Sequence, residues 1–220
     1  MSSKARSAFD KNAKDVKRLL QIHADIGGDA KGRRYGLEVL NKSAVVLITA
    51  VWEAYCEDLA AEALEHLVTN VSESKDLPKE LKKRITAEVE ADKNELAMWD
   101  LAGDGWKTRA RARLVSLTIE RNRKLNTPKS GQIDELFASA IGLLDISSSW
   151  KWPKMSAAKA RDKLDHYITL RGEIAHRGAA AAKVNKTDVT NFFRHVEKLV
   201  RLTGGKANSY VKASTGKALW

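Results

Sequence analysis

The stretch Ala44-Val45-Val46-Leu47-Ile48-Thr49-Ala50-Val51-Trp52 decides the fold of this chain. It contains no charged side chain, and Thr49 is the only residue that interrupts its apolar character. Beyond it, apolar residues recur at steps of three and four, which is the period of an α-helix: Tyr55, Cys56, Leu59, Ala63 and Leu67. A helix that is apolar nearly all round belongs in a protein interior. The sequence therefore predicts a long central helix over about 34–70.

The same period predicts further helices on both sides of this central one. They cover about 4–26, 79–92, 95–101, 106–124, 133–144 and 156–175, and a last one begins at Asn185 or Thr187. Gly204-Gly205 is expected to interrupt or end that last helix. The predicted fold is all-α, a single domain over 1–220. Four main helices form an antiparallel bundle, with a helical insertion at 75–150 and a basic tail at 204–220.

The chain is basic, with 39 Lys and Arg against 28 Asp and Glu and a formal net charge of +11. Such a charge attracts polyanions, nucleic acid among them. The densest basic patch lies in the segment 106–124, where Arg109 and Arg113 share one helix face and Arg121 lies further round. This patch is either a solvated helix face or a track for a phosphate backbone.

The single cysteine, Cys56, excludes a disulfide framework within the chain. The residues Met1-Ser2-Ser3-Lys4 lack the apolar core of a secretory signal. The longest mostly apolar run, 44–52, is far too short to span a bilayer. We therefore expect a cytoplasmic protein with no membrane partner.

Chemistry concentrates in Leu170-Arg171-Gly172-Glu173-Ile174-Ala175-His176-Arg177-Gly178. Arg171 falls on the inward stripe of its predicted helix, and a guanidinium is a planar fork of donors that suits phosphate. Histidine titrates near neutral pH and can transfer protons. On an unbroken helix, however, five residues turn the side chain through a net angle of about 140°. Either the helix breaks just before His176, or two chains combine their residues around a two-fold axis.

Glu53 is the acidic residue nearest to the apolar run of the central helix, and it lies at the edge of the apolar stripe. It is either a boundary ion pair or an acid that orients an active-site arginine. The remaining histidines stand on separate helices and are expected to be surface or boundary residues: His23, His66, His166 and His195. No histidine pair or cysteine cluster has metal-ligand spacing, and neither a phosphate-binding glycine loop nor a serine nucleophile motif occurs.

Two stretches make the sequence resemble the HEPN superfamily. Arg171 and His176 fit its ribonuclease motif, an arginine and a histidine separated by four to six residues. The stretch Val51-Trp52-Glu53-Ala54-Tyr55-Cys56-Glu57-Asp58-Leu59 looks like the early bundle helix of the RiboL-PSP type of HEPN domain. The resemblance is clearest over about 35–70 and 155–203. Gly172 departs from the family, where a polar residue usually follows the arginine.

The resemblance implies a metal-independent endoribonuclease without a cofactor, in which a ribose 2′-hydroxyl attacks the adjacent phosphate and leaves a 2′,3′-cyclic phosphate. His176 would transfer the proton and Arg171 would stabilise the phosphoryl oxygens, with Glu173 or Glu53 in the place of the missing polar helper. Arg109, Arg113, Arg121 and Arg177 are the candidate RNA-binding residues. The expected partners are RNA, a second copy of the chain in a homodimer, and a protein that neutralises a toxin or defence component. The alternative is a noncatalytic HEPN-like module that binds nucleic acid or protein.

Overall fold

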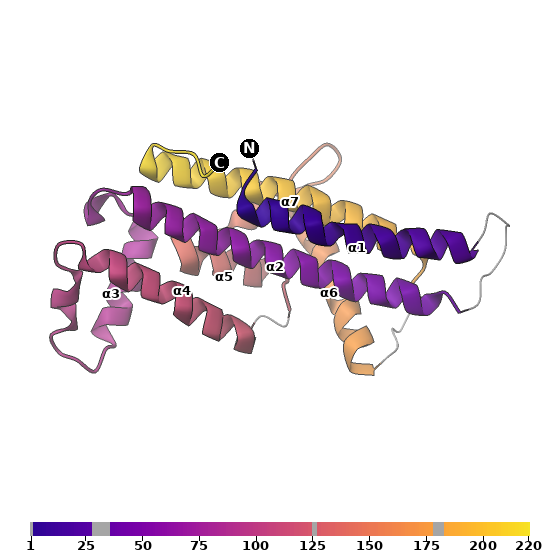
Figure 1. Cartoon of the computed structure of the whole chain (residues 1–220), viewed down its shortest axis with the longest axis horizontal. Coiled ribbons are helices and arrows are strands. Elements are labelled where there is room, and N and C mark those ends of the chain that lie inside the picture. Colours follow the sequence, from indigo (N-terminus) through magenta and orange to yellow (C-terminus); the bar gives the residue numbers. More distant parts are fainter. Residues whose placement is uncertain (1, 28–35, 125–126, 178–182) are drawn as a thin grey trace.

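The computed structural model describes residues 2–27, 36–124, 127–177 and 183–220. The side chains of residue 114, residues 116–124 and Arg177 lie outside this description. The described part contains seven α-helices and three 3-10 turns, arranged as an elongated bundle (Figure 1). The α-helices are α1 (Lys4–Gly27), α2 (Glu38–Asn70), α3 (Lys79–Glu90), α4 (Gly105–Lys124), α5 (Ser130–Ile141), α6 (Ala157–Arg177) and α7 (Lys186–Thr215). The 3-10 turns are η1 (Ser74–Asp76), η2 (Ala97–Leu101) and η3 (Ile146–Ser149).

The all-α prediction is confirmed: no described residue belongs to a strand, and only an isolated antiparallel bridge joins Trp152 to Met155. None of the described helices combines the length and the apolar character that crossing a membrane requires.

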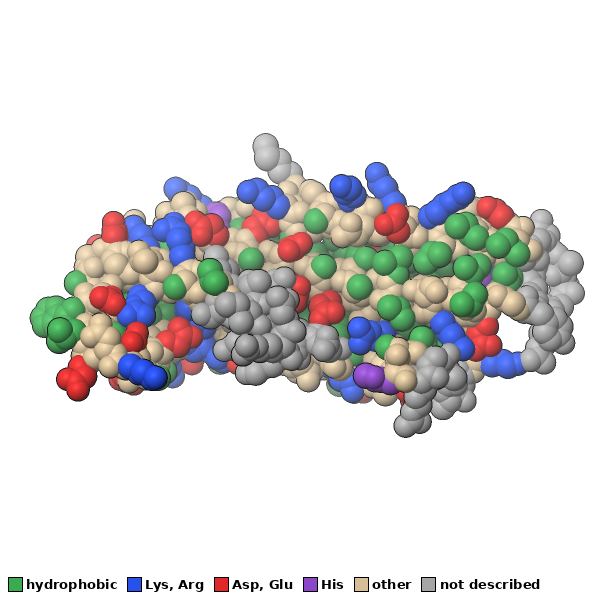
Figure 2. Space-filling model, turned by 60° about the horizontal axis from the view of Figure 1, so that its bottom comes forward, with side chains coloured by type: hydrophobic (Ala, Val, Ile, Leu, Met, Phe, Trp, Pro, Cys, Tyr) green, Lys and Arg blue, Asp and Glu red, His purple; other side chains and the backbone are tan. Residues whose placement is uncertain are grey.

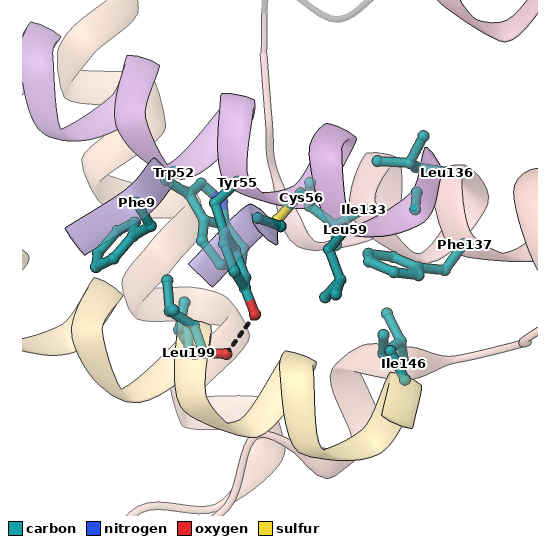
Figure 3. Packing of buried hydrophobic residues seen from close by; sticks show 14 of the residues in the cluster. Phe9, Trp52, Tyr55, Cys56, Leu59, Ile133, Leu136, Phe137, Ile146 and Leu199 are labelled. Carbon is teal, nitrogen blue, oxygen red and sulfur yellow. Dashed lines mark hydrogen bonds between the residues drawn. The ribbon is translucent and has the colours of Figure 1, made fainter. Parts of the chain in front are cut away.

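Helix α2 is the centre of the bundle, as its composition predicts. Helices α1, α4, α5, α6 and α7 all pack against it. Its Trp52, Leu59 and Leu64 are fully buried, and Tyr55 donates a hydrogen bond of 2.8 Å to the carbonyl of Val200 in α7. Figure 3 shows this bond and the side chains of α1, α2, α5 and α7 that meet around it. The apolar side of α2 therefore forms a core that α1 and α7, from the two ends of the chain, share.

Local hydrogen bonds fix where these helices begin. Asn185 caps α7 in a capping box with Asp188, one of the two starts that the sequence allowed. The Ser156 hydroxyl accepts from the backbone of Lys159 at the start of α6. Helix α1 is capped from outside, because Glu62 of α2 accepts hydrogen bonds from the first backbone amides of α1 at 3.0 Å. These caps set the lengths of the helices on which the candidate site depends.

One expectation about the elements is wrong. Gly204-Gly205 does not interrupt α7, which continues to Thr215, so most of the expected basic tail is helical. Helix α5 lies within the predicted insertion, and Ile133, Phe137 and Ile141 on it are fully buried in the common core. The part of the chain between 75 and 150 therefore contributes to the bundle interior as well as to its outer face.

Candidate functional site

Arg171 lies on the inward side of α6, as its spacing predicts. Leu164, Ile168 and Ile174 on the same side are buried in the core. Arg171 is half-buried, and its Nε atom is inaccessible to solvent. A guanidinium in this position is held against the core of the protein, where solvent screening of its charge is reduced.

His176 occupies the last turn of α6, and its side chain is exposed. Helix α6 is continuous from Ala157 to Arg177, so it does not break before the histidine. The five-residue step on a continuous helix separates the two side chains by about 140°. The two side chains therefore leave α6 in different directions, and Arg171 is half-buried whereas His176 is exposed.

Gly172 leaves open space at the position after the arginine. A Cβ atom built on it meets no atom within 4 Å outside its own helix backbone and its chain neighbours. No backbone strain requires glycine there, because the residue is in the middle of a regular helix. Glu173 beside it and Glu53 on α2 are both half-buried. Helices α2 and α6 pack on each other, so the two candidate acids belong to the same pair of helices.

Several polar contacts that the sequence analysis did not foresee hold α6 in place. Asp165 accepts hydrogen bonds from the backbone amide of Ser130 at 2.7 Å and from its hydroxyl at 2.9 Å, which ties α6 to the start of α5. Arg161 donates to the hydroxyl of Ser147. On the other side, the rings of Tyr167 and Phe192 stack with their centroids 4.3 Å apart. These contacts fix the first half of the helix that carries Arg171 and His176.

Of the four predicted RNA-binding arginines, the two whose side chains the structure describes, Arg109 and Arg113, contact acidic residues of the protein itself. Arg109 contacts Asp92 at 3.1 Å and Asp100 at 2.6 Å, and the hydrogen bond that Arg109 donates to Asp100 raises the pKa of its guanidinium. Arg113 is 4% exposed; it binds Glu88 of α3 and donates to the carbonyl of Ser139 in α5. Its guanidinium thus joins three helices inside the protein. The side chains of Arg121 and Arg177 lie outside the described residues.

The wider electrostatics are compatible with a polyanionic partner. Lysine and arginine side chains are spread over the face shown in Figure 2, with acidic groups among them. Within the described residues, no three histidine, cysteine, aspartate or glutamate side chains are grouped as metal ligands would be.

Comparisons with known proteins agree with the helical arrangement. The family model for RiboL-PSP-HEPN matches residues 9–207, which include the whole of α2 and α6. No curated protein and no solved structure matches the chain. The family match covers most of the sequence, from the first helix to beyond Gly204-Gly205. On this evidence the chain belongs to the RiboL-PSP-HEPN family and is a HEPN-type domain.

Proposed function

We propose that this protein is a metal-independent endoribonuclease whose site is composite, with Arg171 from one copy of the chain and His176 from a second copy. The observation that carries this proposal is the continuity of α6 through Arg177, which directs the two side chains to different sides of one helix. A two-fold axis near the end of α6 places each arginine opposite the histidine of the other copy. Membership of the HEPN-type family supports the reaction class.

In the proposed reaction, the ribose 2′-oxygen forms a bond to the adjacent phosphorus, and the bond from phosphorus to the 5′-oxygen breaks. The neutral imidazole of His176 accepts the 2′-hydroxyl proton, and the leaving 5′-oxygen takes a proton from water. The guanidinium of Arg171 stabilises the negative charge that develops on the phosphoryl oxygens. The products are a 2′,3′-cyclic phosphate and a 5′-hydroxyl, and DNA, which has no 2′-hydroxyl, is not cut.

A mixed dimer tests the composite site directly. The Arg171→Ala and His176→Ala chains are co-expressed with different tags, and the heterodimer is isolated by successive affinity steps. One of its two sites keeps an intact arginine and an intact histidine, so we expect RNA cleavage in EDTA at about half the rate of the wild-type dimer. Each homodimeric variant is expected to lose activity by about 10² to 10⁴.

The homodimeric Arg171→Ala protein, purified with the same two tags, is the matched control. A heterodimer as inactive as the two homodimers would exclude a composite site. Equal survival of RNA with the wild-type protein and with His176→Ala would exclude the nuclease altogether. An RNA that carries a single 2′-deoxy nucleotide at the cleaved position must resist cleavage at that position.

Gly172 favours a second candidate function, a noncatalytic module that binds nucleic acid or a protein. The usual polar residue after the arginine is missing, although the structure has room for one. RNA that is bound at low salt and left intact would support this alternative.

As a ribonuclease, the protein would act as a toxin or defence component restrained by a neutralising protein. We expect its expression to arrest cell growth, and we expect His176→Ala to abolish that arrest. Growth unaffected by an active ribonuclease would argue against this biological role.

A further inference from the structure

A cavity of about 490 Å³ opens between α1 and α7, away from the candidate ribonuclease site. Helix α1 contributes Arg6, and α7 contributes Arg201 and Gly205, while the phenol of Tyr55 in α2 and the indole of Trp220 complete the lining. None of the lining residues belongs to α6. A volume of this size lies within the range of pockets that hold small organic ligands, about 300 to 1,000 Å³.

The cavity carries two guanidinium groups at its wall. Arg6 uses its Nε to bind both carboxylate oxygens of Asp10, at 2.9 and 3.0 Å, and its guanidinium lies over the Phe9 ring at 5.7 Å from the centroid. No hydrogen bond to another described residue involves its two terminal nitrogens. Arg201 is exposed and makes no hydrogen bond or ion pair with any residue that the structure describes. Asp10 is thus the one acidic side chain among the lining residues, beside two guanidinium groups whose donors suit a phosphate or carboxylate.

The two glycines of α7 at this cavity differ in what surrounds them. A glycine inside a helix costs about 1 kcal/mol relative to alanine. At Gly204 the protein itself gives the reason, since a Cβ atom would lie 2.7 Å from the Tyr55 hydroxyl. At Gly205 no other atom lies within 4 Å of a Cβ atom, yet the residue lines the cavity. No contact within the described chain accounts for the second glycine.

An aromatic ring is fixed next to this open backbone. Asn208 accepts a hydrogen bond of 2.7 Å from the backbone of Leu219, which attaches the segment before Trp220 to α7. The Trp220 indole then lies 3.6 Å from where a Cβ atom on Gly204 would be. Planar rings stack on an indole of this kind, and an arginine at the rim adds its own flat surface.

We infer that this cavity binds a small ligand made of a flat ring with a single phosphate, the ring against Trp220 and Gly205 and the phosphate on Arg201 and Arg6. The site is independent of the ribonuclease proposal, because it shares no residue with Arg171, His176 or their helix.

Calorimetric titration of the full chain tests this inference with four probes. AMP and 4-nitrophenyl phosphate each have a ring and a phosphate, adenosine has only the ring, and inorganic phosphate has only the anion. We expect both ring phosphates to bind, and each half-probe to bind at least about tenfold more weakly. Binding of AMP but not of 4-nitrophenyl phosphate would identify the ligand as a nucleotide. Binding of both would show that the cavity accepts phosphorylated aromatic rings in general. No binding of either ring phosphate would overturn the inference.

Two variants and their matched controls locate the binding. Arg201→Ala is expected to weaken AMP binding by about tenfold or more, whereas Arg194→Ala, an exposed arginine of the same helix outside the cavity, leaves it unchanged. Gly205→Leu adds a side chain on the cavity wall, at a position where a Cβ atom meets nothing within 4 Å, and must abolish binding, while Ala213→Leu on the exposed part of α7 must not. Binding that survives Gly205→Leu or is insensitive to Arg201→Ala would place the ligand elsewhere and overturn the site. His176→Ala must bind AMP as the wild type does.

Discussion

At the scale of single residues, Gly172 stands where a polar residue usually follows the arginine in the family pattern. The helix is regular there, and the space beyond the backbone is open. A Cβ atom at this position meets no neighbouring atom within 4 Å.

We predict that Gly172→Asn raises the rate of RNA cleavage by about tenfold, because an amide next to Arg171 supplies a further donor to the phosphoryl oxygens. Gly172→Ala is the matched control, since it also raises the helix propensity at this position but adds no polar group. Single-turnover cleavage of a labelled RNA measures the difference. Equal rates for the two variants would mean that the position does not reach the substrate.

The sequence predicted His195 to be a surface or boundary residue, but in the structure it is buried. It is 3% exposed, and its Nε2 donates a hydrogen bond of 3.0 Å to the carbonyl of Ala160, while its ring packs at 5.6 Å from that of Trp152. It stands three residues after Phe192 and four before Leu199, both on the buried stripe of α7, so the helical period alone assigns it to the interior. Burial lowers the pKa of His195 to about 4.

This lowered pKa predicts how stability changes with pH. The unfolded histidine has a pKa of about 6.5, so the unfolded chain binds the proton more readily and stability rises with pH. The contribution of buried His195 to the free energy of unfolding is complete above pH 6.5. It decreases as the pH falls toward 4, by about 2 kcal/mol between pH 7 and 5. Urea unfolding at the two pH values measures it. His195→Gln must reduce the difference, and His166→Gln, at an exposed histidine, must not.

At the residue scale, then, sequence spacing predicted the inward side chain of Arg171 and the intermediate burial of Glu53. It could not predict the role of Arg113. An arginine every second or fourth residue indicates a basic face, but the acceptors of Arg113 come from α3 and α5, which are distant in sequence. Only the packing of three helices turns that arginine from a surface charge into an internal link.

At the scale of elements, helix α7 shows how tertiary packing can outweigh a low local helix propensity. Two successive glycines predict a helix end, and isolated helices do weaken there. In the protein, Tyr210 donates to the carbonyl of Gly142, and Val211 is fully buried beyond the glycines. Packing of this last part of α7 offsets the low helix propensity, which is why the end of the chain is helical.

The two glycines of α7 are expected to respond oppositely to alanine. Gly204→Ala forces a Cβ atom against the Tyr55 hydroxyl and disturbs its bond to Val200, so it should lower the free energy of unfolding by about 2 kcal/mol. Gly205→Ala meets open space and should raise it by about 0.5 to 1 kcal/mol. Chemical denaturation of the two variants gives both values. A stabilising Gly204→Ala would show that α7 and α2 are less closely packed than their contacts indicate.

At the scale of the whole molecule, α2 leaves part of its apolar surface uncovered. The run that predicted a central helix is buried on the sides that face the bundle, but Ala50 is exposed, and Val46 and Leu47 are only partly buried. Val39 is 63% exposed, and Ile26 at the end of α1 is 67% exposed. Figure 2 shows hydrophobic side chains in a band on the half of the molecule that carries the start of α2. The C-terminal end of α6 belongs to the same half in Figure 1.

We expect this apolar surface to be where the second copy of the chain docks in the composite site. Val39→Glu places a charge in that contact, and should convert the dimer to a monomer and abolish RNA cleavage while leaving the helical content and the thermal stability of each chain unchanged. Leu144→Glu is the matched control, because Leu144 is 57% exposed and lies outside this surface. Light scattering coupled to gel filtration gives the mass of each protein. If Val39→Glu remains a fully active dimer, the two-fold axis lies on another face. If the wild-type chain is a monomer at all concentrations, Arg171 and His176 from two copies cannot share one phosphate, and the composite site is excluded.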